Sequence, residues 1–451
     1  MQSLSPDSDP ESKSNFARVA KWCSDGSVAL AQCENRSFQI LQIPEQLTLP
    51  SNAASILPHK RIFSQPSPVL DFTWFPSATP RDPASFCFVA SVRECPVKLL
   101  DASDGRLRAS YRIVDHRERQ VAPHSLVFNT AANRLYCGFE DAIEVFDVQY
   151  PGEGTRLHTT PSKKSRDGLK GIISALAFSA DGASGIYAAG SLSPSSPSSS
   201  NVALFSESTG EVPVMFLGAG GHTRGANFGV RASVAQLMFN PMRPYLLYAS
   251  FRRMGDIYSW DLRGDVSYPA EIFSKDISEK RTVAPPTNQR LRFDIDAGGR
   301  WLGVGDHGGG ISFFDLAAHA PDSSPERHRD TAAVSRSEAT LFYHAHRDAV
   351  GSVAFHPVQA TLLSISGSRH FEPEVPEPTS SSDSSSSASS DENEDRLSRH
   401  NRKRISVRMN RQRSQPFATD ASIKLWNFER DSNNAKDSGK GRGKTVVQYL
   451  Q

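Results

Sequence analysis

The sequence predicts an all-β protein, a seven-bladed β-propeller of the WD40 type. Three observations lead to it. Short apolar segments alternate with Gly, Asp, Asn and Pro turns, and their apolar residues recur with a period of two. One pattern of such segments recurs seven times along the 451 residues. Seven small sheets fit a propeller, because a closed ring leaves no long exposed sheet edge.

Each unit starts with an alternating apolar strand that ends near an aromatic residue. A strand of small apolar residues follows, and then a strand that ends in an aromatic residue with or near Asp. The first aromatic residues lie 50 to 62 residues apart, whereas plain WD repeats span about 40 to 45 residues, which indicates lengthened loops. These aromatic residues are Trp22, Trp74, Phe128, Phe178, Phe239, Phe293 and Phe355.

The units follow one another without a gap large enough for another domain. The fourth unit is interrupted by a Ser/Pro-rich insertion near 191–200. In order, the units are predicted at residues 19–43, 69–113, 124–148, 172–217, 234–262, 291–316 and from 349 onward.

The seventh unit has its first two strands by Ser368, but its third strand, with the pattern D-x-x-I-K-L-W, appears only from Asp420 to Trp426. Between them, residues 371–395 carry eight acids and no base, and residues 396–413 carry eight bases and no acid. Such segregated charges are typical of disorder. We therefore predict a disordered insertion at 371–418 inside the last blade.

This placement sets the predicted domain boundaries. A disordered N-terminus covers 1–14, the propeller covers 15–430, and a C-terminal tail covers 431–451. The outermost strand of the last blade comes either from the N-terminal segment or from residues 445–450, and the sequence does not choose between them.

Composition bounds the location and excludes several kinds of site. No apolar run approaches the roughly 18 to 20 residues of a membrane span, and the polar N-terminus lacks the features of a signal peptide. We expect a protein of the nucleus or cytoplasm that contacts no membrane. The cysteines are odd in number and form no C-x-x-C pair, so we expect buried free thiols and no metal site. They are Cys23, Cys33, Cys87, Cys95 and Cys137.

Two patterns resemble catalytic motifs but favour structural roles. Gly303, Gly305 and Gly308 match a dinucleotide fingerprint, but a strand-like segment follows where the fingerprint needs a helix. A His/Ser/Asp/Trp set in the last unit could pass for a catalytic triad, but WD blades use such a set as a buried hydrogen-bond network. We expect no cofactor, no small-molecule substrate and no catalysis. The set is His346, Ser364 or Ser366, of which we favour Ser366, Asp420 and Trp426.

Basic residues gather in predicted loops of one face. Loops between blades and loops between second and third strands emerge on the same face of a propeller. Arginines there would hold phosphates or stack on RNA bases, and amide or imidazole groups would read base edges. The alternative is an ordinary solvated rim. The basic loop residues are Arg93, Arg117, Arg119, His124, Lys163, Lys164, Arg166, Arg224, Arg252, Arg253, Arg290 and Arg369. From them, with two amide neighbours, we select Arg93, His124, Arg252, Arg253, Asn288, Gln289 and Arg290 as candidate RNA-binding residues.

Several strings lie outside the generic WD consensus, among them SVRECPVKLLDASDGRLRASYR, HSLVFNTAANRLYCGFEDAIEVF, TNQRLRFDID and SGSRHFEPEVPEPTSS. They resemble the WD-repeat family of the telomerase Cajal body protein, of which the chain is identified as a fungal-type member over residues 15–430. The chain departs from the WD pattern where dipeptides are replaced, as at Phe205-Ser206.

The resemblance implies a non-enzymatic RNA-binding scaffold of the nucleus. Family members recognise a loop of box H/ACA small nuclear RNAs and of telomerase RNA and accompany them to Cajal bodies. The implied partners are such RNAs and either dyskerin-type proteins of box H/ACA ribonucleoproteins or snRNP proteins. More distant fungal relatives imply an alternative role in pre-mRNA splicing, as a factor associated with spliceosomal snRNPs.

Two further sequence features bear on function. Trp260-Asp261-Leu262-Arg263 matches the W-D-x-R run by which some propellers dock on a cullin-ring ligase adaptor, so a protein-only adaptor is the second alternative. Arg402, Lys403 and Arg404 in the basic half of the insertion form a candidate nuclear import signal or an additional RNA clamp.

Overall fold

The structure is a computed structural model, and it supports a description of most of the chain. It contains no described helix long and apolar enough to cross a membrane. The described residues are 14–42, 61–162, 164–165, 167–192, 200–218, 232–274, 288–317, 334–371, 416–428 and, for the backbone alone, the strand at 446–450.

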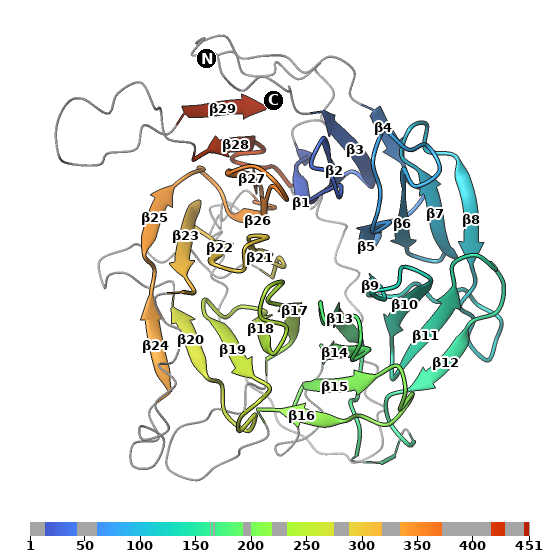
Figure 1. Ribbon diagram of the computed structural model, residues 1–451. Coiled ribbons are helices and arrows are strands. Elements are labelled where there is room, and N and C mark those ends of the chain that lie inside the picture. The colour runs from blue at the N-terminus through green and yellow to red at the C-terminus, as the bar shows by residue number, and fades with distance from the viewer. Residues whose placement is uncertain are drawn as a thin grey trace, which may run out of the picture.

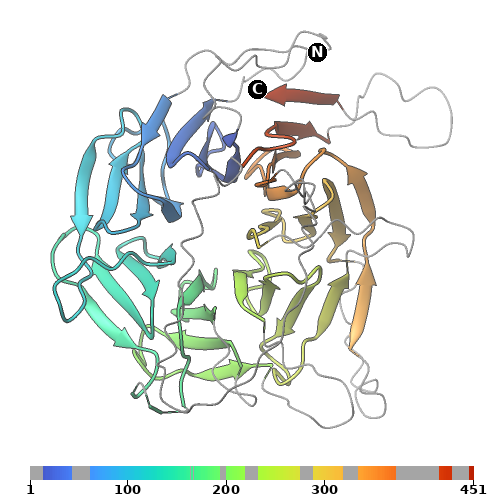
Figure 2. The ribbon, with the colours of Figure 1, turned by 180° about the vertical axis from the view of Figure 1, so that it is seen from behind.

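Seven sheets, antiparallel except for one parallel edge pair, stand around a central channel, so the predicted all-β seven-bladed propeller is confirmed (Figure 1). Six sheets have four strands and one has five. The first and last blades lie side by side in both views (Figures 1 and 2). Each blade runs from an innermost first strand outward, which is the order expected of a WD-type unit.

The first four blades follow chain order. They consist of β1 (Ala17–Trp22), β2 (Val28–Cys33), β3 (Ser37–Gln42) and β4 (Arg61–Ser64); β5 (Val69–Trp74), β6 (Cys87–Val92), β7 (Val97–Asp101) and β8 (Leu107–Tyr111); β9 (Ser125–Phe128), β10 (Arg134–Phe139), β11 (Ala142–Asp147) and β12 (Thr155–His158); and β13 (Ile173–Phe178), β14 (Ile186–Ser191), β15 (Val202–Ser206) and β16 (Met215–Leu217).

The last three blades include one departure from chain order. They consist of β17 (Val234–Phe239), β18 (Leu246–Phe251), β19 (Ile257–Asp261), β20 (Glu271–Ser274) and β24 (Ser335–Glu338); β21 (Phe293–Ile295), β22 (Trp301–Gly305), β23 (Gly310–Asp315) and β25 (Leu341–His344); and β26 (Val350–Phe355), β27 (Thr361–Ser366), β28 (Ile423–Asn427) and β29 (Val446–Leu450).

The second strands form the most deeply buried layer of the ring. In β2, β6 and β27 every residue is buried, because a central strand of one blade is covered by the blades on both sides. This explains their small and apolar composition. The five cysteines are free thiols, and all but Cys95 are buried.

A belt of hydrogen bonds joins the seven innermost strands into a ring. At every seam, a side chain of one innermost strand bonds the backbone of the next, so that buried polar groups are satisfied across the blade boundary. In order around the ring the pairs are Trp74 Nε1 to Lys21 O at 2.9 Å, Leu126 N to Asp71 Oδ2 at 2.9 Å, Ser125 Oγ to Ile173 O at 2.8 Å, Ser174 Oγ to Val234 O at 2.7 Å, Gln236 Nε2 to Phe293 O at 2.8 Å, Phe355 N to Asp294 Oδ2 at 2.7 Å and Trp22 Nε1 to Ala354 O at 3.0 Å.

One segment completes the outer edges of two blades, which the sequence did not predict. Strand β24 pairs in parallel with β20 of the fifth blade, and β25, which follows almost at once, pairs antiparallel with β23 of the sixth. The two strands run end to end along the rim (Figures 1 and 2). The Ser337 hydroxyl donates to Glu271 across the parallel pair. Residues 335–344 therefore form a strap that links the fifth and sixth blades on the outside of the ring.

The last blade is assembled from segments that are distant in sequence. As predicted, its third strand is β28, which follows the insertion and pairs with β27. Strand β29 pairs with β28 and is the outermost strand of the sheet, so of the two alternatives the C-terminal segment occupies this position.

The predicted insertion itself lies largely outside the described residues, but both of its ends are described. His370 and Phe417 exchange backbone hydrogen bonds of 2.8 and 3.0 Å. The buried carboxylate of Asp348 accepts hydrogen bonds from Ser368 Oγ at 2.6 Å and from Thr419 N at 3.2 Å, and lies 2.8 Å from His370 Nε2. The chain therefore leaves and re-enters the blade at one point.

The predicted hydrogen-bond network of the last blade is present, with one correction. The serine is Ser364, and Ser366 was the wrong choice. Ser364 Oγ lies 2.7 Å from His346 Nε2 and accepts the indole N–H of Trp426 at 2.8 Å. Ser366 is the last residue of β27, two positions after Ser364, and its hydroxyl donates to the Asp348 carbonyl at 3.1 Å.

Asp420, which follows the insertion in the sequence, also belongs to this network. Its carboxylate accepts hydrogen bonds from the Arg347 and Ser422 amides at 2.8 and 2.9 Å and lies 3.7 Å from His346 Nδ1. Burial raises the pKa of Asp420, but the hydrogen bonds from His346, Arg347 and Ser422 outweigh it and hold that pKa well below its usual range.

We expect Asp420→Ala to lower the free energy of unfolding at pH 7 by about 2 kcal/mol, because hydrogen bonds to a charged acceptor are lost. A carboxyl whose folded pKa lies below its unfolded value stabilises fully above the unfolded pKa, and the contribution falls as pH drops toward the folded pKa. Urea unfolding at pH 7 and below pH 4 checks this. The difference between wild type and variant should shrink at the lower pH. A pH-independent difference would contradict the role assigned to the carboxylate.

Candidate nucleic-acid interface

The seven candidate RNA-binding residues lie in loops that share one face of the ring, and several of them are in contact. Arg253 Nε donates to Asn288 Oδ1 at 2.6 Å. Gln289 lines a small cavity together with Arg252 and Arg253. We call this group, extended below, the arginine cluster.

Arg290 extends across the mouth of the central channel. It lies just before β21 of the sixth blade, and its Nη1 donates to the His124 carbonyl, just before β9 of the third blade, at 3.5 Å. These two blades are on opposite sides of the ring in Figure 1. A contact between residues 166 positions apart arises only because the ring closes.

The electrostatics of the arginine cluster are those of crowded cations. Burial, and then the neighbouring Arg292 and Arg252, lower the pKa of Arg290 to about 9, so the guanidinium is still a cation at pH 7. Burial and Arg292 also lower the pKa of Arg252. Burial, followed by Arg290, Arg93 and Arg252, lowers the pKa of His124, which keeps the imidazole neutral at pH 7. The site therefore disfavours additional positive charge.

A single carboxylate, that of Asp71, is shared among the buried cations beneath this mouth. Its Oδ1 lies 3.8 Å from both Lys21 Nζ and Arg292 Nη2, and its Oδ2 accepts the Leu126 amide of the neighbouring blade. Arg292 has 16% of its side chain exposed. The Nε atoms of Arg252 and Arg292 are buried and have no hydrogen-bond partner within the described residues. Donors of this kind are costly unless an acceptor reaches them.

Sequence reasoning missed Lys21 and Arg292, which belong to the arginine cluster. Lys21 lies in the innermost strand β1, and Arg292 lies one residue before β21. One sequence feature could have revealed them. Each is a basic residue in or directly beside an otherwise apolar innermost strand, and innermost strands of a propeller line its central channel. We now define the arginine cluster as Lys21, Arg93, His124, Arg252, Arg253, Asn288, Gln289, Arg290 and Arg292.

The remaining basic loop residues contribute less to the interface. Arg119 pairs with Asp115 at 2.7 Å, and Arg369 shares the carboxylate of Glu34 with Arg18, so both guanidinium groups already have an acidic partner. Arg117 is exposed. The predicted residues that lie outside the described part of the chain are Lys163, Arg166, Arg224, Arg402, Lys403 and Arg404.

The features that suggested other chemistry have structural roles. Strand β23 follows Gly305 and Gly308, where a dinucleotide site would need a helix. The described residues contain no group of three or more potential metal ligands. The Arg263 guanidinium bonds Asp261 at 3.0 and 2.7 Å and stacks 3.6 Å from the centre of the Tyr245 ring, so its donors are engaged within the fold.

Comparison with known proteins points to one family. The chain is 30% identical over 372 residues to Telomerase Cajal body protein 1 of Bos taurus, across 82% of this chain and 60% of that protein. The Homo sapiens protein of that name is also 30% identical over 372 residues, with 59% of its length covered, and the Drosophila melanogaster homolog is 22% identical over 370 residues. The chain spans about three fifths of the length of these curated relatives. No protein-family model matches it.

The crowding of cations predicts an anion-dependent gain in stability. Pyrophosphate should raise the melting temperature above that in chloride at equal ionic strength. A ligand at ten times its Kd adds about 1.4 kcal/mol to the free energy of unfolding. Arg290→Gln should lose most of this gain, whereas Arg81→Gln, at an exposed arginine of the opposite face, should keep it. Differential scanning calorimetry checks this, and an equal gain in both variants would contradict anion binding at the channel mouth.

Proposed function

Because the chain belongs to the Telomerase Cajal body protein 1 family, we propose that it is a non-enzymatic nuclear scaffold that binds a small non-coding RNA through its arginine cluster. The RNA is a box H/ACA small Cajal body RNA or telomerase RNA, and the scaffold supports assembly or localisation of the ribonucleoprotein. The proposal extends to this chain the association with telomerase and the Cajal body that the relatives' name states. Dyskerin-type proteins would be its partners.

One observation carries the proposal: the buried Nε donors of Arg252 and Arg292 have no hydrogen-bond partner within the described residues and lie beside Arg290, while the nearby carboxylate of Asp71 is shared by Arg292 and Lys21. Keeping these cations together costs free energy in the free protein, through lost hydration and mutual repulsion. Phosphate oxygens would accept the free donors and offset the charge. An RNA backbone supplies such phosphates at regular spacing, which favours RNA over a neutral ligand.

The geometry suggests separate roles within the arginine cluster. Arg290 and Arg252, which are half-buried, would hold phosphates at the channel mouth. Arg253 and Arg93 are exposed, so their planar guanidinium groups are available to stack on unpaired bases. Arg253 also fixes the Asn288 side chain through Oδ1, which leaves the amide N–H groups to read a base edge.

Two alternative functions, a role in splicing and a role as a cullin-ring adaptor, would use different surfaces. A role in splicing would use the same surface on a spliceosomal small nuclear RNA, so the identity of the crosslinked RNA separates it from the leading proposal. A cullin-ring adaptor role would use Arg263, whose guanidinium is already bound to Asp261 and stacked on Tyr245. No observation favours that role over RNA binding.

Charge reversal at four arginines tests the proposal. A variant with Arg93, Arg252, Arg253 and Arg290 changed to Glu should bind a box H/ACA small RNA at least about a hundredfold more weakly and with a shallower salt dependence, because phosphate contacts are lost. Filter binding across a salt series measures both effects. The matched control reverses four exposed arginines of the opposite face, Arg81, Arg106, Arg134 and Arg263, and should bind nearly as wild type. Unchanged binding by the first variant, or no small RNA crosslinked to the wild type, would refute the assignment.

Protonation of His124 should be coupled to RNA binding. Burial, and then the neighbouring Arg290, Arg93 and Arg252, keep its pKa low in the free protein despite the opposing effect of Asp71, and a bound phosphate would raise that pKa again. Affinity should therefore increase as pH falls from 7.5 to 5.5, by up to about tenfold for each unit of that pKa rise. His124→Gln should remove this increase, whereas His116→Gln, at an exposed histidine of the preceding loop, should retain it. Titrations at fixed ionic strength measure the slope, and a slope that survives in His124→Gln would rule out this coupling.

A further inference from the structure

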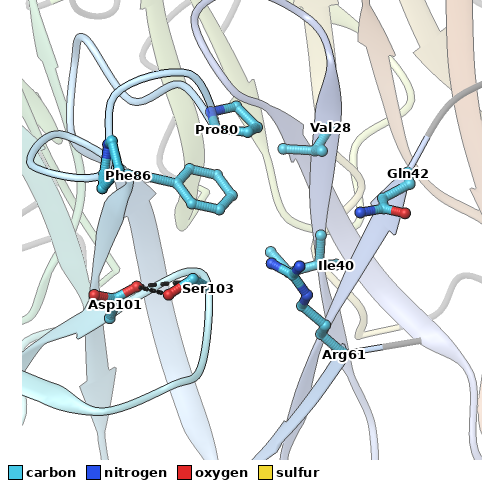
Figure 3. A pocket seen from close by; sticks show the side chains of 9 residues that line it. Val28, Ile40, Gln42, Arg61, Pro80, Phe86, Asp101 and Ser103 are labelled. Atoms are coloured by element: carbon cyan, nitrogen blue, oxygen red, sulfur yellow. Dashed lines mark hydrogen bonds between the residues drawn. The ribbon is translucent and has the colours of Figure 1, made fainter. Parts of the chain in front are cut away.

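A cavity of about 220 Å³ opens between the first two blades, on the face opposite the arginine cluster. One wall consists of Val28 and Ile40 from the first blade, and the other includes Pro80 and Phe86 from the loop between β5 and β6 of the second. Figure 3 shows these apolar side chains facing one another across the cavity. An apolar cavity of about 150 Å³ already accommodates a benzene-sized group, so this one has room for a large side chain.

The cavity is preformed, because hydrogen bonds pin the loop that makes its far wall. The Ala78 carbonyl accepts the Ser24 hydroxyl of the first blade at 2.8 Å, and Thr79 Oγ1 donates to Asp25 at 2.5 Å. Arg108 donates to the carbonyl oxygens of Pro83 and Ala84 at 2.5 Å each. A ligand would therefore meet a wall that needs little further ordering, which favours binding.

Of the two charged residues that line the cavity, Asp101 and Arg61, only Asp101 has a counter-charge among the described residues. Asp101, at the base, is bound by Arg108 at 2.8 Å, by Arg106 at 3.3 Å and by the Ser103 hydroxyl at 2.5 Å. The side chain of Arg61, by contrast, is exposed and makes no hydrogen bond or ion pair with any part of the chain that the structure describes. In Figure 3 its side chain extends beside Ile40 toward the middle of the cavity.

We propose that this cavity binds a short acidic peptide segment of a partner protein, which inserts one large apolar side chain and places a neighbouring carboxylate on Arg61. An Arg–carboxylate pair is a strong charge-assisted contact, and the apolar walls supply the burial that a salt bridge alone would lack. A nucleic acid fits poorly, because its successive phosphates would also meet the exposed Asp82 and Asp104 beside the cavity-lining Pro83 and Ser103, whereas a peptide can place a single carboxylate on Arg61. Strand β4 is the outermost described strand of its sheet, and its outer edge would be available to an extended peptide.

Selection of random peptides displayed on phage, with the full chain as bait, tests this. The enriched peptides should combine Asp or Glu with a neighbouring Leu, Ile, Phe or Trp. In fluorescence polarisation, a synthetic copy of such a peptide should bind Arg61→Glu at least about tenfold more weakly than wild type. Gln42→Trp, at an exposed lining residue, should block the cavity while Arg61 remains, and should also abolish binding. Arg134→Glu, at an exposed arginine of the third blade, is the matched control and should bind within about twofold of wild type.

Three outcomes would overturn the proposal. The first is no enrichment, and the second is a peptide that binds Arg61→Glu or Gln42→Trp as tightly as wild type. The third is binding only after residues 43–60 are replaced by a Gly-Ser linker, which would make that segment of this chain the occupant. RNA binding by Arg61→Glu should be unchanged because the two faces are opposite, so failure here is distinguishable from failure of the RNA proposal.

Discussion

Closure of the ring is the constraint on which the rest of this structure depends. A four-stranded sheet buries its second strand on both faces only when a blade stands on each side, as the fully buried β2, β6 and β27 illustrate. Each seam is therefore held by a side chain that bonds the next innermost strand. The last seam has to join segments from the two ends of the chain, and Trp22 makes that bond to Ala354, 332 residues away. This explains why the last blade carries the densest buried polar network, which also joins segments before and after the insertion.

Closure also creates the arginine cluster and sets its free-energy cost. Arg290 and His124 belong to blades on opposite sides of the ring and meet at the channel mouth, where Lys21 and Arg292 share Asp71 with a backbone amide of the ring belt. Asp71 thus has a structural role and an electrostatic one. An arrangement in which like charges are crowded and donors stay unsatisfied is unfavourable for folding alone. Such local costs are expected where a protein binds something of opposite charge.

The two faces of the ring differ in chemistry. One collects the guanidinium groups of the arginine cluster, which suits a phosphate backbone. The other has a preformed cavity with apolar walls and Arg61, whose side chain has no partner within the described residues, which suits a single side chain and its neighbouring carboxylate. A rigid ring keeps these faces apart, so ligands on the two sides would neither clash nor compete. This separation is the physical property that a scaffold for a ribonucleoprotein requires, and it follows from the closed ring.

The sequence by itself determined the fold class, the number of blades and the position of β28 beyond the insertion, because strand period, turn residues and the repeat are local signals. It also selected candidate residues in loops that share a face, since loop order alone assigns them to that face. Only the tertiary structure decided that Ser364 rather than Ser366 joins His346 and Trp426, that β29 is the outermost strand, and that β24 and β25 strap two blades together. Nor could loop order reveal the contact of Arg290 with His124 or the place of Lys21 and Arg292 beside Asp71. Register, pairing across long gaps and proximity across the channel depend on how the ring closes, and no local pattern encodes that closure.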